Sequence, residues 1–136
     1  IADATAAKVK EAGIQRVGLL GTRFTMEEDF YRGRLADQFA LQVMIPDEND
    51  RATVHRIIYE ELCVGFIRPE SKAQLAGIMN RLVERGAQGI ILGCTELGLL
   101  IDAGDARAPI FDTTRLHALA AVEYALQPQA DEALHA

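Results

Sequence analysis

The sequence predicts an α/β fold: a mainly parallel sheet of about four strands with helices on both faces. Three observations predict it. Short, continuous apolar runs alternate with amphipathic segments of helical spacing, the pattern of a parallel sheet covered on both faces. Glycine and other turn-forming residues follow the apolar runs. The 136 residues suit one compact domain, and 49% of them are hydrophobic, which is enough for a buried core.

Four short apolar runs are the expected strands. In chain order they are Arg16–Leu20, Leu41–Ile45, Gly89–Leu92 and Pro109–Phe111. Between and around them, segments with helical periodicity or helix-boundary residues predict helices at 2–12, 25–39, 47–62, 70–85, 96–101 and 113–126. In a flavodoxin-like strand order, the first and third strands are neighbours and their following loops share one crevice.

Two helix assignments depend on specific residues. Thr25 and Glu28, in the segment TMEE, form a capping-box pattern that predicts a helix start at Thr25. In that helix, Phe30, Leu35 and Phe39 are expected to face inward. Cys63 follows an amphipathic helix and is expected in or near the core.

Composition excludes several classes of function. The formal net charge of −6 argues against nucleic-acid binding, which requires a face rich in Lys and Arg. No apolar run approaches the roughly 18 residues of a membrane span. Two cysteines do not make a disulfide framework, so a reducing, cytoplasmic location is expected. The histidines have no metal-ligand spacing, and no metal site is expected.

The candidate chemistry lies where strands end, because ligands of open α/β sheets bind beyond the carboxyl ends of the strands. Two such loops are polar: Gly21–Thr25 (GTRFT) and Gly93–Glu96 (GCTE). Cys94 is the strongest candidate, since a thiol at a helix N-terminus meets free amides that favour the thiolate. That thiolate would act as a nucleophile or as a base. The alternative is an inert, buried cysteine.

Four other residues are weaker candidates, each with a structural alternative. Thr22 and Thr25 offer hydroxyls that can hold a carboxylate or phosphate, although Thr25 also fits an N-cap. Lys72 is a cation able to grip an anionic substrate, or a solvated surface lysine. Glu96 can orient the Cys94 thiol, or stabilise a helix N-terminus.

These motifs resemble a known family. The segment GIILGCTE (Gly89–Glu96), preceded by RGAQ (Arg85–Gln88), resembles the aspartate/glutamate racemase superfamily. The segments LLGTRFTMEEDFYRGRL (Leu19–Leu35) and GCTELGLLI (Gly93–Ile101) are similar to its broad-specificity amino-acid racemases. The resemblance extends from Ile1 to about Leu126.

The resemblance implies racemisation of amino acids (aspartate, glutamate or a broad range) by two-base proton transfer at Cα, without a cofactor. Cys94 matches one acid/base of the family. Thr22 and Lys72 match substrate-contacting positions, and Thr95 falls where a backbone amide receives the carboxylate. Glu96 belongs to the same signature and would tune Cys94.

The resemblance also implies that the chain corresponds to the second half of a two-domain enzyme. Residues 1–111 would form the second α/β domain, and 112–127 a returning helix that packs on the first domain. Residues 128–136 would be a polar tail. The opposing acid/base would belong to the N-terminal half-domain, absent from this sequence, and a homodimer is expected.

Two other classes of function remain open at this stage. One is a cysteine-dependent decarboxylase or hydrolase of small carboxylic acids on the same scaffold, in which Cys94 protonates an enediolate or attacks a carbonyl. The other is a non-catalytic module that binds carboxylates in the strand-end crevice.

Overall fold

The structure is a computed structural model that describes residues 1–127. Its centre is a sheet of four parallel strands in the order β2-β1-β3-β4. The strands are β1 (Arg16–Leu20), β2 (Gln42–Met44), β3 (Gly89–Leu92) and β4 (Ile110–Asp112). The predicted fold class is confirmed, and all four expected strands form to within one or two residues of their predicted bounds.

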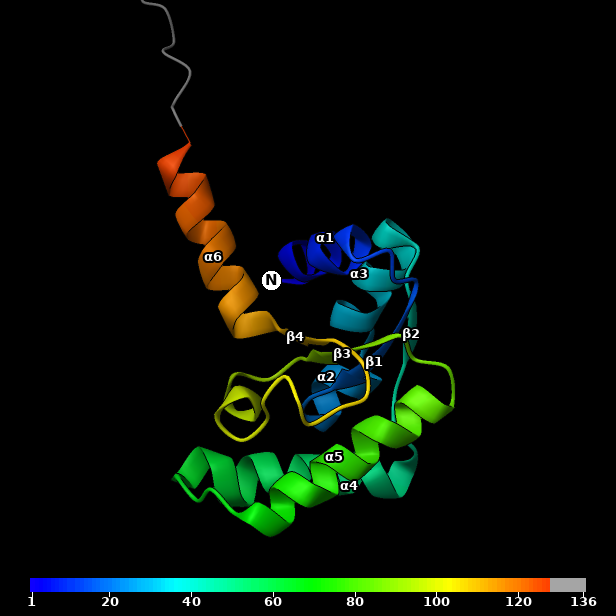
Figure 1. Cartoon of the computed structure of the whole chain (residues 1–136), viewed down its shortest axis with the longest axis vertical. Helices are drawn as coiled ribbons and strands as arrows, with labels where there is room; N and C mark the ends of the chain where they lie inside the picture. The colour runs from blue at the N-terminus through cyan, green and yellow to red at the C-terminus, as the bar shows by residue number, and fades with distance from the viewer. Residues whose placement is uncertain (128–136) are drawn as a thin grey trace, which may run out of the picture.

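Helices cover both faces of the sheet (Figure 1). One face carries α1 (Ala2–Glu11), α3 (Asp29–Phe39) and α6 (Thr113–Leu126), and the opposite face carries α4 (Glu48–Arg56) and α5 (Pro69–Glu84). Four shorter turns complete the chain: α2 (Arg23–Glu27), the π turn η1 (Ile57–Glu61), and the 3-10 turns η2 (Leu62–Val64) and η3 (Thr95–Leu99).

Alternation along the central strands divides the core into two clusters, one on each face of the sheet. Val17 and Leu19 of β1 pack with α1 and α3, together with Ile91 of β3. Leu20 and Ile90 face the other way and pack against α4 and α5. All five side chains are fully buried. Burial on both faces explains why these strands read as continuous apolar runs rather than as alternating ones.

The segment after β1 differs from the prediction. Thr22, not Thr25, is the N-cap: its hydroxyl accepts from the backbone N–H of Thr25 at 3.3 Å. The helix is also interrupted, because Glu28 is extended (φ −80°, ψ 152°) and separates α2 from α3. The expected inward position of Phe30 is wrong, since its side chain is 67% exposed, whereas Leu35 is buried as predicted.

The predicted helix over 47–62 forms as α4 followed by η1 and η2. The changed winding places Glu61 inside, where it is 6% exposed. Its carboxylate accepts from Ser71 Oγ at 2.5 Å and from Arg56 Nη1 at 2.7 Å. Cys63, expected in or near the core, is exposed instead. The π turn η1 shifts the helical phase, and Cys63, in the 3-10 turn that follows, therefore lies at the surface.

Replacing Glu61 with glutamine is expected to lower the free energy of unfolding at pH 7 by about 2 kcal/mol, because a buried carboxylate loses its charge and with it the ion pair to the half-exposed Arg56. The hydrogen bond from Ser71, followed by Arg56, lowers the pKa of Glu61 below 4.5. The stabilisation is therefore present at neutral pH and is lost as the pH falls through the folded-state pKa. Urea unfolding at pH 7 and at acidic pH measures it. The exposed neighbour Glu60→Gln is the control, and equal stability of both variants would contradict the prediction.

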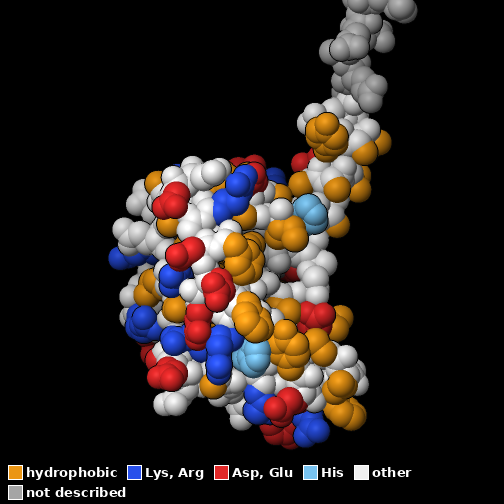
Figure 2. Space-filling view, turned by 180° about the vertical axis from the view of Figure 1, so that it is seen from behind, with side chains coloured by type: hydrophobic (Ala, Val, Ile, Leu, Met, Phe, Trp, Pro, Cys, Tyr) orange, Lys and Arg blue, Asp and Glu red, His pale blue; other side chains and the backbone are white. Residues whose placement is uncertain are grey.

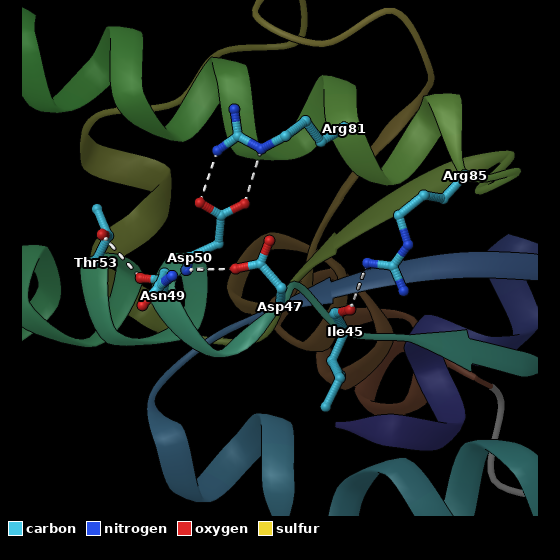
Figure 3. Close-up of polar contacts among 7 residues, drawn as sticks. All are labelled: Ile45, Asp47, Asn49, Asp50, Thr53, Arg81 and Arg85. Atoms are coloured by element: carbon cyan, nitrogen blue, oxygen red, sulfur yellow. Dashed lines mark hydrogen bonds and ion pairs between the residues drawn. The ribbon is translucent and has the colours of Figure 1, made fainter.

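Polar contacts fix the start of α4 against α5 (Figure 3). Asp47 caps α4 by accepting from the amide of Asp50 at 2.9 Å. Arg81 of α5 donates two hydrogen bonds to the carboxylate of Asp50, at 2.8 and 2.7 Å. Arg85 donates to the carbonyl of Ile45, just after β2, at 3.1 Å. These contacts hold α4 in one place beside the sheet.

Further predictions concern the C-terminal segment and membrane-spanning helices. The helix predicted at 113–126 forms with those bounds as α6. The predicted polar tail at 128–136 lies outside the described residues. Within residues 1–127, no helix has both the length and the apolar character to cross a membrane.

Candidate active site

Three strands end side by side at one edge of the sheet, and their following segments form the candidate site. Parallel pairing brings Leu20 of β1 beside Leu92 of β3, and Leu92 beside Asp112 of β4. The segments that follow are Gly21–Thr25, Gly93–Glu96 and Thr113–Thr114. The predicted meeting of the first two loops is confirmed by these strand registers.

Glycine is required at position 93 by the close approach of the two loops. The amide of Gly93 donates to the carbonyl of Leu20 at 2.7 Å. A Cβ at position 93 would lie 3.0 Å from that carbonyl oxygen and 3.0 Å from Cγ2 of Thr25. The β1 loop and the Cys94 turn are therefore in direct contact.

Cys94 follows Gly93 in an extended conformation and is half-buried. Its thiol donates to Oε2 of Glu96, with a sulfur–oxygen distance of 2.8 Å. The hydroxyl of Thr95 donates to the same oxygen at 2.7 Å. One carboxylate thus holds the thiol and its neighbouring hydroxyl, so the sequence GCTE forms one polar unit at the end of β3.

Burial first, and then the hydrogen bond to the carboxylate of Glu96, raise the pKa of the Cys94 thiol to about 12, whereas the backbone amide of Glu96 acts in the opposite direction. The amide of Glu96 does favour the thiolate, as expected, but the net pKa of Cys94 is raised instead of lowered. η3 is a five-residue 3-10 turn, and burial with an anionic neighbour outweighs its amides. Hydrogen bonds from Cys94 and Thr95 lower the pKa of Glu96. At neutral pH the pair is a thiol beside a carboxylate.

A hollow of about 210 Å³ lies beside this unit. Its lining contains residues from all three strand-end segments together with apolar neighbours: Thr25, Gly93, Thr95, Thr113, Thr114, Ile1, Phe30 and Tyr31. The hollow can take a small ligand. Its wall is mostly apolar, although four threonines from the three strand-end segments contribute to it.

The predicted site residues are partly brought together. Thr25 and Thr95 line the hollow, and Thr22 lies one turn away, with its hydroxyl 3.3 Å from that of Thr25. Lys72 of α5 is held elsewhere: its ammonium bonds Asp102 at 2.9 Å and Asp105 at 3.0 Å. A contact between Lys72 and a substrate stays a prediction. To make it, the Lys72 ammonium would have to give up its bonds to Asp102 and Asp105.

Sequence reasoning missed five residues of the hollow, of which Thr113 and Tyr31 are the buried ones. Thr113 is buried and donates to the carbonyl of Leu92 at 2.7 Å, which ties the start of α6 to the end of β3. Tyr31 of α3 has a buried hydroxyl with no hydrogen-bond partner among residues 1–127, and burial raises its pKa. The position of Thr113 at the start of a predicted helix, two residues after a predicted strand, was the available signal. Nothing in the sequence indicated Tyr31.

No group of three or more His, Cys, Asp or Glu side chains in the described part of the chain is arranged to hold a metal ion. The arrangement that is present can do proton chemistry. The raised pKa keeps Cys94 protonated, so that the thiol is a proton source, and the carboxylate 2.8 Å away accepts its hydrogen bond. The adjoining hydroxyls and amides suit a carboxylate ligand.

Solved structures of other proteins are similar to this chain in both sequence and fold. A Yersinia pestis structure described as "a putative Asp/Glu Racemase" is 54% identical, with a TM-score of 0.89 over 93% of this chain and 55% of that one. An aspartate racemase homologue from Pyrococcus horikoshii OT3 is 36% identical, with a TM-score of 0.82 over 91% of this chain and 54% of that one. The chain thus spans about half the length of these two proteins.

A further relative comes from Pectobacterium carotovorum subsp. carotovorum, where it is named "Uncharacterized protein in pnlA 3'region". It is 33% identical over 102 residues, which cover 75% of this chain and 66% of that protein. The sequence pattern of the family described as Asp/Glu/Hydantoin racemase matches residues 1–121. The family match over residues 1–121 includes the Cys94 unit at the end of β3, and it shows that this chain belongs to the Asp/Glu/hydantoin racemase family.

Proposed function

We propose that the protein carrying this chain racemises amino acids by two-base proton transfer at Cα, without a cofactor, and that Cys94 is one of the two acid/bases. The observation that carries the proposal is the Cys94–Glu96 pair beside the strand-end hollow. Family membership supports the reaction class.

The proton can move in either direction through this pair. As an acid, the protonated Cys94 thiol returns a proton to a planar Cα. As a base, the thiol must first lose its proton, and Glu96 Oε2 at 2.8 Å is the acceptor in place. An α-proton is weakly acidic, so the substrate carboxylate needs donors that stabilise the developing charge. The Thr95 amide and the hydroxyls of Thr22 and Thr25 are the proposed donors.

The opposing acid/base is proposed to lie in a first half-domain. This chain covers 55% and 54% of the length of two relatives, which supports the proposal. In this proposal residues 1–111 are the second domain, and 112–127 carry the helix that packs on the first. The α6 side chains Leu119, Val122, Tyr124 and Leu126 are 47–79% exposed. Figure 1 shows α6 extending away from the sheet, with an uncovered side. The half-domain would cover those apolar side chains.

A chiral assay of the whole protein across a panel of L-amino acids tests the function, with deuterium incorporation at Cα as the second readout. The expected result is formation of the D-enantiomer together with solvent deuterium at Cα. A malonate-type acid is included, because loss of carbon dioxide from it would identify a decarboxylase instead. Carboxylate binding without any Cα exchange would replace racemisation by a binding function.

A further inference from the structure

His55 of α4 contacts the loop after β1, although 32 residues separate the two in sequence. The backbone N–H of Arg23 donates a hydrogen bond to Nδ1 of His55 at 3.1 Å. Arg23 begins α2, and first-turn amides have no acceptor within their own helix. Thr22 accepts from the amide of Thr25, and His55 accepts from that of Arg23. The imidazole is thus a second cap on α2, supplied from another element.

Aromatic neighbours fix the orientation of the His55 ring. Its centroid lies 6.3 Å from that of Phe24, edge to face at 70°, and 4.7 Å from that of Tyr59 in η1. Such pairs add specific geometry to simple burial. The Phe24 and Tyr59 side chains are 58% and 48% exposed, and Figure 2 shows hydrophobic side chains gathered on one face of the molecule. Since an N–H group only donates, Nδ1 is the acceptor and the neutral ring carries its proton on Nε2.

The element that carries His55 is itself fixed. Asp47 caps α4, and the paired hydrogen bonds between Arg81 and Asp50 attach its first turns to α5 (Figure 3). The contact to Arg23 therefore joins the β1 loop to a clamped helix rather than to a mobile side chain.

The loop held by His55 touches the turn of Cys94. Cγ2 of Thr25 lies 3.0 Å from the place of a Cβ on Gly93, and Thr25 lines the hollow beside Thr95. A displacement of α2 would therefore move the Thr22 and Thr25 hydroxyls relative to Cys94. It would also move Met26 of α2, which belongs to the core cluster against which Cys94 packs, and so expose the thiol.

We infer that His55 is a positioning residue of this site: by accepting the Arg23 amide, it sets the place of the Gly21–Thr25 loop against the Cys94 turn. Its effect on the loop follows from these contacts alone. Its effect on turnover rests on the proposed racemisation.

The test compares two substitutions in the whole protein. His55→Ala removes the hydrogen-bond acceptor. His55→Asn keeps one, because its side-chain oxygen takes approximately the position of Nδ1 and can accept from the Arg23 amide. The exposed Glu60→Gln is the control. Three quantities are measured: hydrogen exchange of the Arg23 amide, the rate of Cys94 alkylation in a Cys63→Ser background, and kcat and KM for both enantiomers.

His55→Ala is expected to speed exchange of the Arg23 amide by about fivefold, the effect of losing one hydrogen bond. Alkylation of Cys94 should rise severalfold, and kcat/KM should fall by about tenfold. His55→Asn should recover most of each change, because it restores the acceptor. Exchange and alkylation at wild-type rates in His55→Ala would overturn the inference, and so would failure of His55→Asn to improve on it.

The readouts separate this inference from the proposed function. If the wild type racemises no amino acid, the exchange and alkylation rates still decide the role of His55 in placing the loop. If the wild type is active and His55→Ala changes those rates while kcat and KM stay unchanged, His55 places the loop but does not position it for turnover. That result overturns the second part of the inference and leaves the proposed function unaffected.

Discussion

Cys94→Ala is expected to abolish the proposed racemisation in both directions, with a loss of more than 10³-fold in kcat, because no other thiol lies at the end of β3. Cys94→Ser is expected to lose nearly as much, since an alcohol is a far weaker acid than a thiol and cannot replace it as a proton carrier. The measurement is chiral conversion of each enantiomer by the whole protein. Cys63→Ser is the matched control: that cysteine is exposed and its loss should leave kcat unchanged.

Deuterium incorporation sharpens the same experiment. In a two-base mechanism each base serves one face of Cα, so Cys94→Ala should lose exchange for one enantiomer only. The other enantiomer should still exchange its α-proton without inversion, through the opposing base. Wild-type exchange of both enantiomers would remove Cys94 as an acid/base.

Glu96→Gln is expected to lower the pKa of Cys94 from about 12 and to reduce kcat by about 10²-fold. The pKa falls because the anionic oxygen that accepts the thiol proton is replaced by a neutral amide. Turnover falls because glutamine cannot take up that proton when Cys94 acts as a base. The two readouts therefore move in opposite directions: the thiolate forms more readily, and the enzyme becomes slower.

The pH dependence of Cys94 alkylation in a Cys63→Ser background measures this pKa. For the wild type, the alkylation rate should keep rising above pH 10 without a plateau, and in Glu96→Gln the midpoint should move down. Thr95→Val is the companion variant, because it removes the other hydrogen bond to Oε2 and leaves the charge in place. An unchanged midpoint in Glu96→Gln would show that Glu96 does not control the thiol.

The strands and the strand-end loops could be predicted from the sequence because their signals are local. An apolar run followed by Gly21 or by Gly93 locates both the strand and its turn. The choice between Thr22 and Thr25 as the cap could not be made in this way. The pattern TMEE favours Thr25, but in the fold this side chain packs against Gly21 and Gly93, and Thr22 takes the cap.

The chemistry of Cys94 depended on tertiary structure. A strand-end cysteine before a predicted helix indicates a low pKa, and the outcome is reversed by burial and by the rotamer that brings Glu96 to the sulfur. The contact between His55 and Arg23 spans 32 residues and leaves no local pattern. The exposure of Cys63 follows from the π turn η1, which shifts the helical phase that the apolar spacing had predicted.

The exposed side of α6 has a thermodynamic consequence. A helix of 14 residues is near the length at which isolated helices are marginal in water, and most of its stabilisation must come from packing. Along its second half, Val122, Tyr124 and Leu126 meet solvent instead. The last turns of α6 should therefore fray when uncovered and wind up when an apolar surface covers them. The ordering of α6 and its docking onto that surface would then be one coupled equilibrium. The conformational entropy that α6 loses would weaken its observed affinity for the apolar surface.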